Sequence, residues 1–201
     1  MQDISITDQT WATTFPRLIS IRENEWLVGV LLRCDESNHW SSGSTLAYLL
    51  DTTSKRKLKQ RVELLSEIHL KKLASVLAVS LASIVATTSQ EELVRIRGGM
   101  SPRTKLSHSS VPFHLCPICV ADSRFLARTL ALPGITHCPR HQISLVARCQ
   151  CGTTLLPFFP STVPFTCSKC GLNWAEIPYV HADTELIEAE QKLLSHLETR
   201  A

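Results

Sequence analysis

The sequence has no apolar run long enough to cross a membrane. Its longest nearly apolar stretch, residues 73–86, has 14 residues and includes three serines, whereas a membrane-spanning helix needs about 20 apolar residues. Residues 1–20 have no basic start followed by an apolar stretch, so no signal peptide is predicted. Internal repeats and low-complexity segments are also missing. We therefore expect a soluble, cytoplasmic protein that makes no contact with a membrane.

The composition is that of an ordinary globular chain. Of its 201 residues, 44% are hydrophobic and 19% are charged, and the formal net charge is +3. This length allows one or two small domains. Neither half is long enough to build a deep hydrophobic core alone, so we expect bound metal to hold the second half together.

Seven of the eight cysteines lie in the second half of the chain with one histidine, in two sets of four. Closely spaced pairs of such residues on tight turns supply the tetrahedral ligands that Zn²⁺ prefers. We predict two structural zinc ions, one in a Cys₃His site and one in a Cys₄ site, with the ligands Cys116, Cys119, Cys138, His141, Cys149, Cys151, Cys167 and Cys170. Gly152 and Gly171 each follow a ligand, where the chain must turn with a positive φ. Sequential sites are the simplest pairing, and an interleaved cross-brace stays open.

Other roles for these residues are less favoured. Disulfide bonds need an oxidising compartment, and no segment directs the chain to one. His114 and His137 lie beside predicted ligands and are alternatives to them, although we interpret both as flanking residues. Cys34 has no cysteine nearby and is expected to be a small buried apolar residue.

The residues needed for catalysis do not stand out. Both cysteine sets are complete at four ligands, whereas catalytic zinc keeps an open position. No Ser/His/Asp or Cys/His nucleophile set is recognisable in the sequence. We therefore expect that the protein is not an enzyme.

Basic residues are clustered in two places. A run without an acidic residue occupies positions 55–61, and more cations follow within residues 97–110. Such clusters are typical of contacts with the phosphate backbone of DNA or RNA, and the alternative is a solvated helix face. The candidate nucleic-acid-binding residues are Lys55, Arg56, Lys57, Lys59, Arg61, Arg103 and Lys105.

The first half has helical periodicity. Ser20 and Glu23 form a capping-box pattern and predict a helix that carries Trp26, Leu27, Val30 and Leu31. Further helices are expected after Gly43, through residues 58–65, after Ser66 and after Ser80. A last helix is predicted for residues 184–197.

Residues 66–88 fit a helix-turn-helix. Small residues at Ala74 and Ala78 and an apolar residue at Ile84 occupy the positions that two helices crossing over a tight turn require. A simple helical hairpin is the alternative. The expected recognition helix, residues 80–88, has no Arg, Lys or Asn. We therefore expect poor discrimination between bases, because bidentate base contacts need such side chains.

The predicted domain division follows from a change in composition. Residues 97–110 are rich in Gly, Ser and Pro and lack apolar periodicity, which is typical of a linker. The predicted fold class is therefore a small-domain α+β protein: a helical domain with a helix-turn-helix over residues 1–96, then a linker, then a tandem zinc-ribbon domain with a C-terminal helix over residues 111–201. Trp11 and Phe15 precede the first helix and are candidate partner-binding residues, or they pack onto their own domain.

The cysteine region resembles the zinc region of the TniQ family of transposition proteins. Residues 113–152 read FHLCPICVADSRFLARTLALPGITHCPRHQISLVARCQCG. They share with that family a Cys-Pro-x-Cys knuckle at 116–119, a Cys-Pro-x-His knuckle at 138–141, and then a leucine at 145 and a second cysteine cluster from 149. The opening of the chain, with Phe15-Pro16 and Glu25-Trp26-Leu27, is also similar to the start of the family.

The resemblance implies a role in choosing transposition targets. Longer members of the family are similar to readers of attachment-site DNA, whereas this chain resembles the short TniQ of CRISPR-associated transposons. The implied function is an adaptor between an RNA-guided CRISPR effector with its guide RNA and an AAA+ transposition regulator, with self-association left open. The alternative is a sequence-specific DNA-binding protein that selects an attachment site directly.

Overall fold

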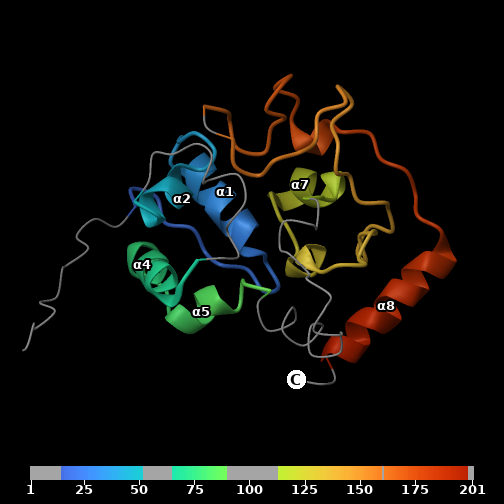
Figure 1. Cartoon of the computed structure of the whole chain (residues 1–201), viewed down its shortest axis with the longest axis horizontal. Coiled ribbons are helices and arrows are strands. Elements are labelled where there is room, and N and C mark those ends of the chain that lie inside the picture. The colour runs from blue at the N-terminus through green and yellow to red at the C-terminus, as the bar shows by residue number, and fades with distance from the viewer. Residues whose placement is uncertain (1–14, 52–64, 90–112, 160, 199–201) are drawn as a thin grey trace, which may run out of the picture.

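The computed structural model describes residues 15–51, 65–89, 113–159 and 161–198. Helices dominate the first half, and short loops around one helix form most of the second (Figure 1). The helices and 3₁₀ turns are α1 (Leu27–Ser37), α2 (Ser44–Leu49), α4 (Glu67–Leu77), α5 (Leu81–Val85), α7 (Pro117–Ser123), η2 (Arg128–Ala131), η3 (Trp174–Glu176) and α8 (Thr184–Glu198). Within these ranges, none of the helices has the length and apolar character that crossing a membrane requires.

Helix α1 is the centre of the first half. Every residue from Leu27 to Asp35 is buried, so this helix is surrounded by protein rather than lying at the surface. The predicted start at Ser20 is wrong, because α1 begins at Leu27 with Trp26 as its N-cap. Residues before it are held by tertiary contacts: the backbone N–H of Trp26 donates to the carbonyl of Leu126 over 2.8 Å. These contacts replace the hydrogen bonds of a longer helix.

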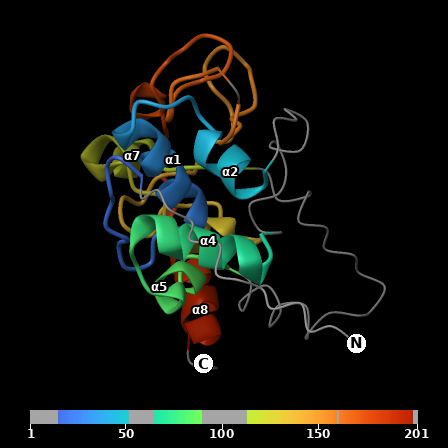
Figure 2. The ribbon, with the colours of Figure 1, turned by 90° about the vertical axis from the view of Figure 1, so that its left-hand side faces the viewer.

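Helices α4 and α5 form the predicted hairpin and lie side by side (Figure 2). Both predicted starts are confirmed: α4 follows Ser66, and the Ser80 hydroxyl accepts a hydrogen bond from the Ser83 N–H over 3.0 Å. Ala78 turns the chain with a φ of 54°, and Ile84 of α5 is fully buried. Alanine carries a Cβ, so this left-handed backbone costs about 1–2 kcal/mol, which the packing of the two helices must offset. The wider assignment as a DNA-binding helix-turn-helix stays a prediction.

The second half contains no regular strand within the described residues. Five isolated antiparallel bridges take the place of a sheet, among them Leu115 with Val146 and Thr166 with Asn173, and a sixth joins Ala127 to Glu25 of the first half. The fold is therefore mostly helical with few strand-like pairs, and the zinc-ribbon assignment stays a prediction.

The two halves share one hydrophobic core. The rings of Trp26 and Phe113 stack with their centroids 5.8 Å apart, and Phe113 is 5.4 Å from Trp174. Gly29 of α1 lies so close to Leu126 that an added Cβ would stand 3.2 Å from the Leu126 Cβ. The predicted linker, residues 97–110, lies outside the described residues.

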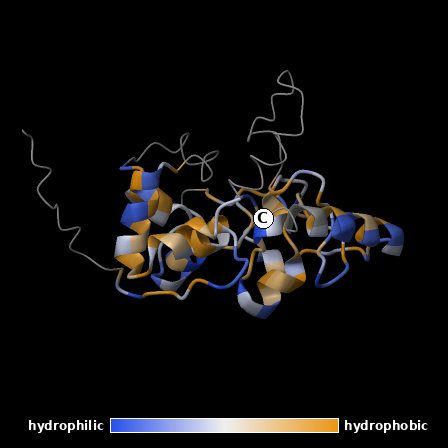
Figure 3. Cartoon of the chain, turned by 90° about the horizontal axis from the view of Figure 1, so that it is seen from below, coloured by the Kyte–Doolittle hydropathy of each residue, from blue (hydrophilic) through white to orange (hydrophobic). Residues whose placement is uncertain are grey.

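Helix α8 lies at the edge of the second half (Figure 1) and carries both hydrophobic and hydrophilic residues (Figure 3). Ile187 is buried, and Leu194 packs against Leu132 and Ile135. Leu186 and Leu193 stay exposed. The predicted helix over residues 184–197 is therefore confirmed, and one of its apolar sides packs back onto the chain.

Candidate metal centres

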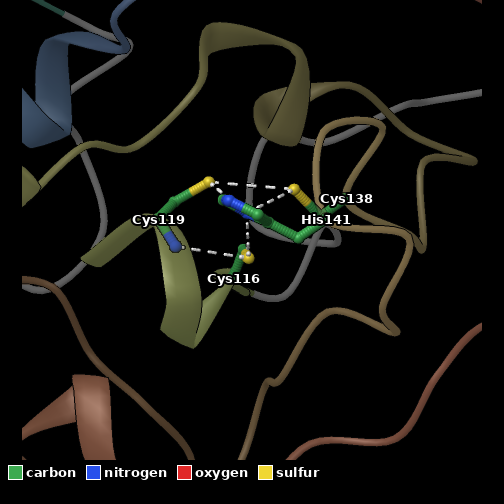
Figure 4. A group of neighbouring side chains, drawn as sticks. All are labelled: Cys116, Cys119, Cys138 and His141. Atoms are coloured by element: carbon green, nitrogen blue, oxygen red, sulfur yellow. Dashed lines mark hydrogen bonds between the residues drawn. The ribbon is translucent and has the colours of Figure 1, made fainter. Parts of the chain in front are cut away.

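The first cluster joins two turns that are far apart in sequence. Cys116, Cys119, Cys138 and His141 place their ligand atoms within 4.8 Å of one another. The Cys119 and Cys138 Sγ atoms are 3.7 Å apart, and the His141 Nδ1 atom is 3.3 Å from the Cys116 Sγ and 3.2 Å from the Cys119 Sγ (Figure 4). The imidazole thus presents Nδ1, not Nε2, to the three sulfurs.

These separations fit a tetrahedral metal ion. A zinc–sulfur bond of about 2.3 Å implies sulfur atoms about 3.8 Å apart at the corners of a tetrahedron. The Cys119–Cys138 separation is close to that value, and so are the 3.6 Å between the Sγ atoms of Cys149 and Cys170 and the 3.7 Å between those of Cys151 and Cys167. Each group could therefore hold one ion.

Local sequence explains how the first cluster forms. Cys116 is the N-cap of α7, Pro117 occupies the first turn, and the Cys119 N–H points at the Cys116 sulfur over 3.5 Å. Proline suits this position because its ring fixes a helical φ and it has no N–H to leave unpaired. On the other turn, the Gln142 N–H donates to the Cys138 carbonyl over 2.8 Å. The two turns bring their four ligand atoms within 4.8 Å of one another.

The second cluster consists of Cys149, Cys151, Cys167 and Cys170. Its two turns close with hydrogen bonds from Gly152 N–H to the Cys149 carbonyl and from Gly171 N–H to the Cys167 carbonyl. Both glycines have the predicted positive φ, 80° at Gly152 and 74° at Gly171. The structure therefore groups the eight predicted side chains as sequential sites would, without interleaving.

The pKa values of the cluster thiols are shifted in both directions: hydrogen bonds with Thr153 lower the pKa of the Cys151 thiol to about 6, whereas that of Cys149 is shifted upward. Burial raises the pKa of the Cys149 thiol to about 12, and the neighbouring sulfurs of Cys170 and Cys167 add to the rise. A divalent cation offsets this effect, because it stabilises several thiolates at one point. The donor set is thus suited to a bound metal ion.

Cys34 is separate from both clusters. It lies in α1, is fully buried, and burial raises the pKa of its thiol to about 12. A thiol with such a pKa stays neutral and packs as a small apolar group. His114 and His137 also lie outside the two groups.

His137 instead bonds to α8. Its Nδ1 lies 2.9 Å from the Glu190 carboxylate, which also accepts hydrogen bonds from the backbone N–H groups of Thr136 and His137. Glu190 therefore joins α8 to the residues directly before Cys138. No motif in the sequence indicates this contact, because its partners are 53 and 54 residues apart.

The other predicted site residues divide into two kinds. Phe15 is 6% exposed, and its ring lies 5.1 Å from that of Trp40 and 5.8 Å from that of Tyr48. The hypothesis that it is a partner-binding anchor does not fit this position, because the ring belongs to the core. Trp11 and the candidate nucleic-acid-binding residues lie outside the described residues: Lys55, Arg56, Lys57, Lys59, Arg61, Arg103 and Lys105.

Two buried carboxylates were not predicted. Glu25 is fully buried and receives two hydrogen bonds from the Arg33 guanidinium, at 2.7 and 2.6 Å. Asp35 accepts hydrogen bonds from the N–H groups of Gly43 and Thr45 at the start of α2, and burial raises its pKa to about 6. Glu25 precedes α1 and Arg33 lies eight residues further on, within it, so no helical spacing indicated this pair. Neither carboxylate lies in a metal cluster.

Two four-ligand clusters that could each hold a metal ion, on a mostly helical body, define the class of this protein. A family model identifies it further: the TniQ model matches residues 16–145, and the chain belongs to the TniQ family. This family is associated with transposition and is not known as an enzyme family. The matched region includes the first cluster and ends before the second. No curated protein matches the chain at a significant level.

Proposed function

We propose that this protein is a target-selection adaptor in transposition that links an RNA-guided CRISPR effector to an AAA+ transposition regulator. Two structural zinc ions hold its second half. DNA or RNA phosphates meet its basic segments, and the partner proteins meet exposed apolar surface. The proposal rests on one observation: in a chain that belongs to a transposition family, the exposed surface of α5 lacks the side chains that read base pairs.

Helix α5 offers little to a base pair. It has five residues, Leu81–Val85, and its exposed positions there and in the following turn are Ala82, Val85 and Ala86. The hydroxyl groups of Ser80 and Ser83 are bonded to each other over 2.8 Å, and those of the following turn, Thr87, Thr88 and Ser89, belong to buried residues. Direct readout in the major groove uses Arg, Lys, Asn or Gln side chains on an exposed helix. A protein with this hairpin is better suited to join partners than to read a sequence alone.

The ligand sets favour zinc in a structural role. Three thiols with an imidazole, and four thiols, are the donor sets of closed zinc sites, and each group supplies all four positions from the chain itself. Zinc bound this way contributes folding free energy and no open coordination position for a substrate. The residues around each ion thereby gain a fixed shape.

Exposed apolar side chains follow the second cluster and are available to protein partners. Tyr179 is 44% exposed and Val180 is 67% exposed, and both line an open groove of about 420 Å³ with Leu145 and Val146. Arg148 is the charged residue of that lining. Aromatic and arginine side chains are enriched where proteins meet.

Binding measurements on the purified full chain test the adaptor role. We expect weak duplex-DNA binding with little sequence preference, together with co-purification of the guide-RNA effector and of the ATPase when these are produced in the same cells. Several small interfaces then supply the combined affinity. Nanomolar, sequence-selective binding to a defined duplex by the isolated protein would replace the adaptor with the attachment-site reader.

Neutralising the basic run tests the nucleic-acid part of the proposal. Replacement of Lys55, Arg56, Lys57 and Lys59 by Gln should weaken association with nucleic acid and make the logarithm of the affinity fall less steeply with the logarithm of salt concentration. The reason is that each lost phosphate contact releases about one counterion fewer. Replacement of Lys71 and Lys169 by Gln is the control. An unchanged salt slope in the first variant would assign the run to a solvated helix face.

A further inference from the structure

Asp122 lies behind the histidine of the first metal cluster. It belongs to α7, and its Oδ2 atom is 3.3 Å from the His141 Nε2 atom. The other ring nitrogen, Nδ1, faces the sulfurs of Cys116, Cys119 and Cys138 at 3.3, 3.2 and 3.6 Å. The imidazole therefore lies between the carboxylate on one side and the metal position on the other.

This arrangement selects one tautomer of the ring. A neutral imidazole that gives the Nδ1 lone pair to a metal ion carries its proton on Nε2. Asp122 Oδ2 is 3.3 Å from that nitrogen. A carboxylate at this distance is placed to accept the proton, which would fix the rotation of the ring and make Nδ1 a stronger donor. Arg140 Nη2 lies 3.9 Å from the same Oδ2 atom.

The second cluster has no equivalent of this pair. Its four ligands are all thiols, which carry no second nitrogen for a carboxylate to orient. Cys170 is also exposed, whereas all three cysteines of the first cluster are buried. The two metal positions therefore differ in their support as well as in their ligands.

We propose that Asp122 is the positioning residue of the first metal site: it holds His141 in the Nε2–H tautomer, aims Nδ1 at the metal ion and thereby slows the loss of that ion. The inference rests on the zinc proposed above and is independent of the adaptor role. It assigns to α7 two tasks, because the helix supplies Cys119 as a ligand and Asp122 as the support of a ligand on another turn.

Zinc release from the full chain tests this role. The zinc-loaded wild type, D122A and D122N are mixed with a chromophoric zinc chelator at one fixed pH. D122A should lose one zinc ion about tenfold faster than the wild type, at the lower end of the range for such supports because the Asp122 side chain is 45% exposed. D122N should give an intermediate rate, since its amide oxygen still accepts the Nε2 proton. The other zinc ion should leave at the wild-type rate in all three proteins.

A matched variant separates positioning from loss of surface charge. Glu67 is an exposed carboxylate on α4 that pairs with Lys71 over 2.7 Å, far in sequence from both clusters. E67Q should release both ions at wild-type rates. Equal release from wild type and D122A, or equal acceleration in E67Q, would overturn the role of Asp122 while leaving the zinc sites in place. A wild type that binds no zinc would overturn the proposed zinc sites and, with them, the role of Asp122.

The tautomer of the His141 ring and the exchange rate of its proton provide a second measurement. Loss of packing alone would not produce the same change in them. In ¹⁵N spectra of the zinc-loaded wild type, we expect a metal-bound Nδ1 and a protonated Nε2 whose proton exchanges slowly with solvent. In D122A that proton should exchange faster, and in D122N the protection should be partly restored. A metal-bound Nε2 in the wild type would contradict the assignment directly.

Discussion

The helical first half and the cysteine-bearing second half reach order by different means. In the first, nine consecutive residues of α1 are buried and the neighbouring helices cover them. In the second, the longest helix between residues 113 and 183 has seven residues, and isolated bridges replace a sheet. Hydrophobic burial can hold the first half, whereas loops with so little regular secondary structure need cross-links that tie them together.

The comparison also shows that the halves are not independent. Trp26, Phe113 and Trp174 form a continuous row of rings from one half to the other. Arg124 at the end of α7 pairs with Glu36 of α1 over 3.1 Å. Loss of order around the metal positions should therefore also destabilise the helical core. Variants in each half, and at the contact between them, test whether this is so.

Loss of a thiolate ligand should have the largest effect. C119S and C170S each remove one ligand from a closed site, and zinc contributes about 10–16 kcal/mol in isolated structural sites, as much as a whole domain's stability. We expect both variants to lose the ordered second half in thermal melts and in limited proteolysis. C34S changes a buried thiol outside the clusters and should keep its metal. Zinc loss from C34S equal to that from C119S would contradict the ligand assignment.

Removal of a ring at the junction should rank next. Trp174 is 1% exposed and contacts both Phe113 and Phe165. Truncation of such a ring costs about 3–5 kcal/mol, so W174A should lower the unfolding free energy of both halves together in urea titrations. Y179A, which shortens a ring that is 44% exposed, is the control and should stay near the wild type. Destabilisation of the second half alone would mean that the core does not couple them.

The two halves should respond to pH in opposite directions. Burial raises the pKa of Asp35 to about 6 from an ordinary value of 3.8. The folded state thus binds a proton more readily than the unfolded state, and the contribution of Asp35 to stability falls as pH rises toward 6. The metal clusters act the other way, because protons compete with zinc for thiolates.

D35N isolates the first of these effects. Relative to D35N, which cannot ionise at this position, the wild type should lose about 1.4 kcal/mol of unfolding free energy between pH 5 and pH 7, the equivalent of one pH unit. Urea titrations of both proteins at the two pH values measure the difference. A constant difference between them would show that Asp35 titrates well outside this range.

The most local effect is expected where α8 meets the first cluster. Partial burial of Glu190 opposes ionisation, but hydrogen bonds from Thr136 and His137 prevail and lower its pKa. E190Q should free α8 locally, at a cost of about 1–3 kcal/mol for hydrogen bonds to a charged group. Hydrogen exchange should increase in residues 184–198 and little elsewhere. E188Q, an exposed neighbour on α8, should exchange as the wild type does.

The parts of the fold that depend on near neighbours were predictable. Gly43, Ser66 and Ser80 precede α2, α4 and α5 as predicted, because capping and turn preferences act over a few residues. The same rule failed at Ser20. There the Arg22 N–H donates to the Glu25 carboxylate, and Glu25 is drawn into the buried pair with Arg33. Tertiary contacts decided that segment.

The candidate site shows the same division. The spacing of the cysteines predicted which eight side chains would meet, since knuckle geometry is local. The carboxylates that contact residues in or beside the first cluster could not be predicted. Asp122 is 19 residues from His141, and Glu190 is 54 residues from Thr136. Only the folded path of the chain brings these groups together.

Metal content is the most direct test of the claim that zinc orders the second half. Protein purified without added metal should contain close to two zinc ions per chain by elemental analysis, and C119S and C170S, where recoverable, no more than one each. Removal of both ions from the wild type should disorder residues 113–198 and lower the stability of the helical half through the shared core. A wild type with less than one zinc ion per chain that keeps its full thermal stability would contradict the account.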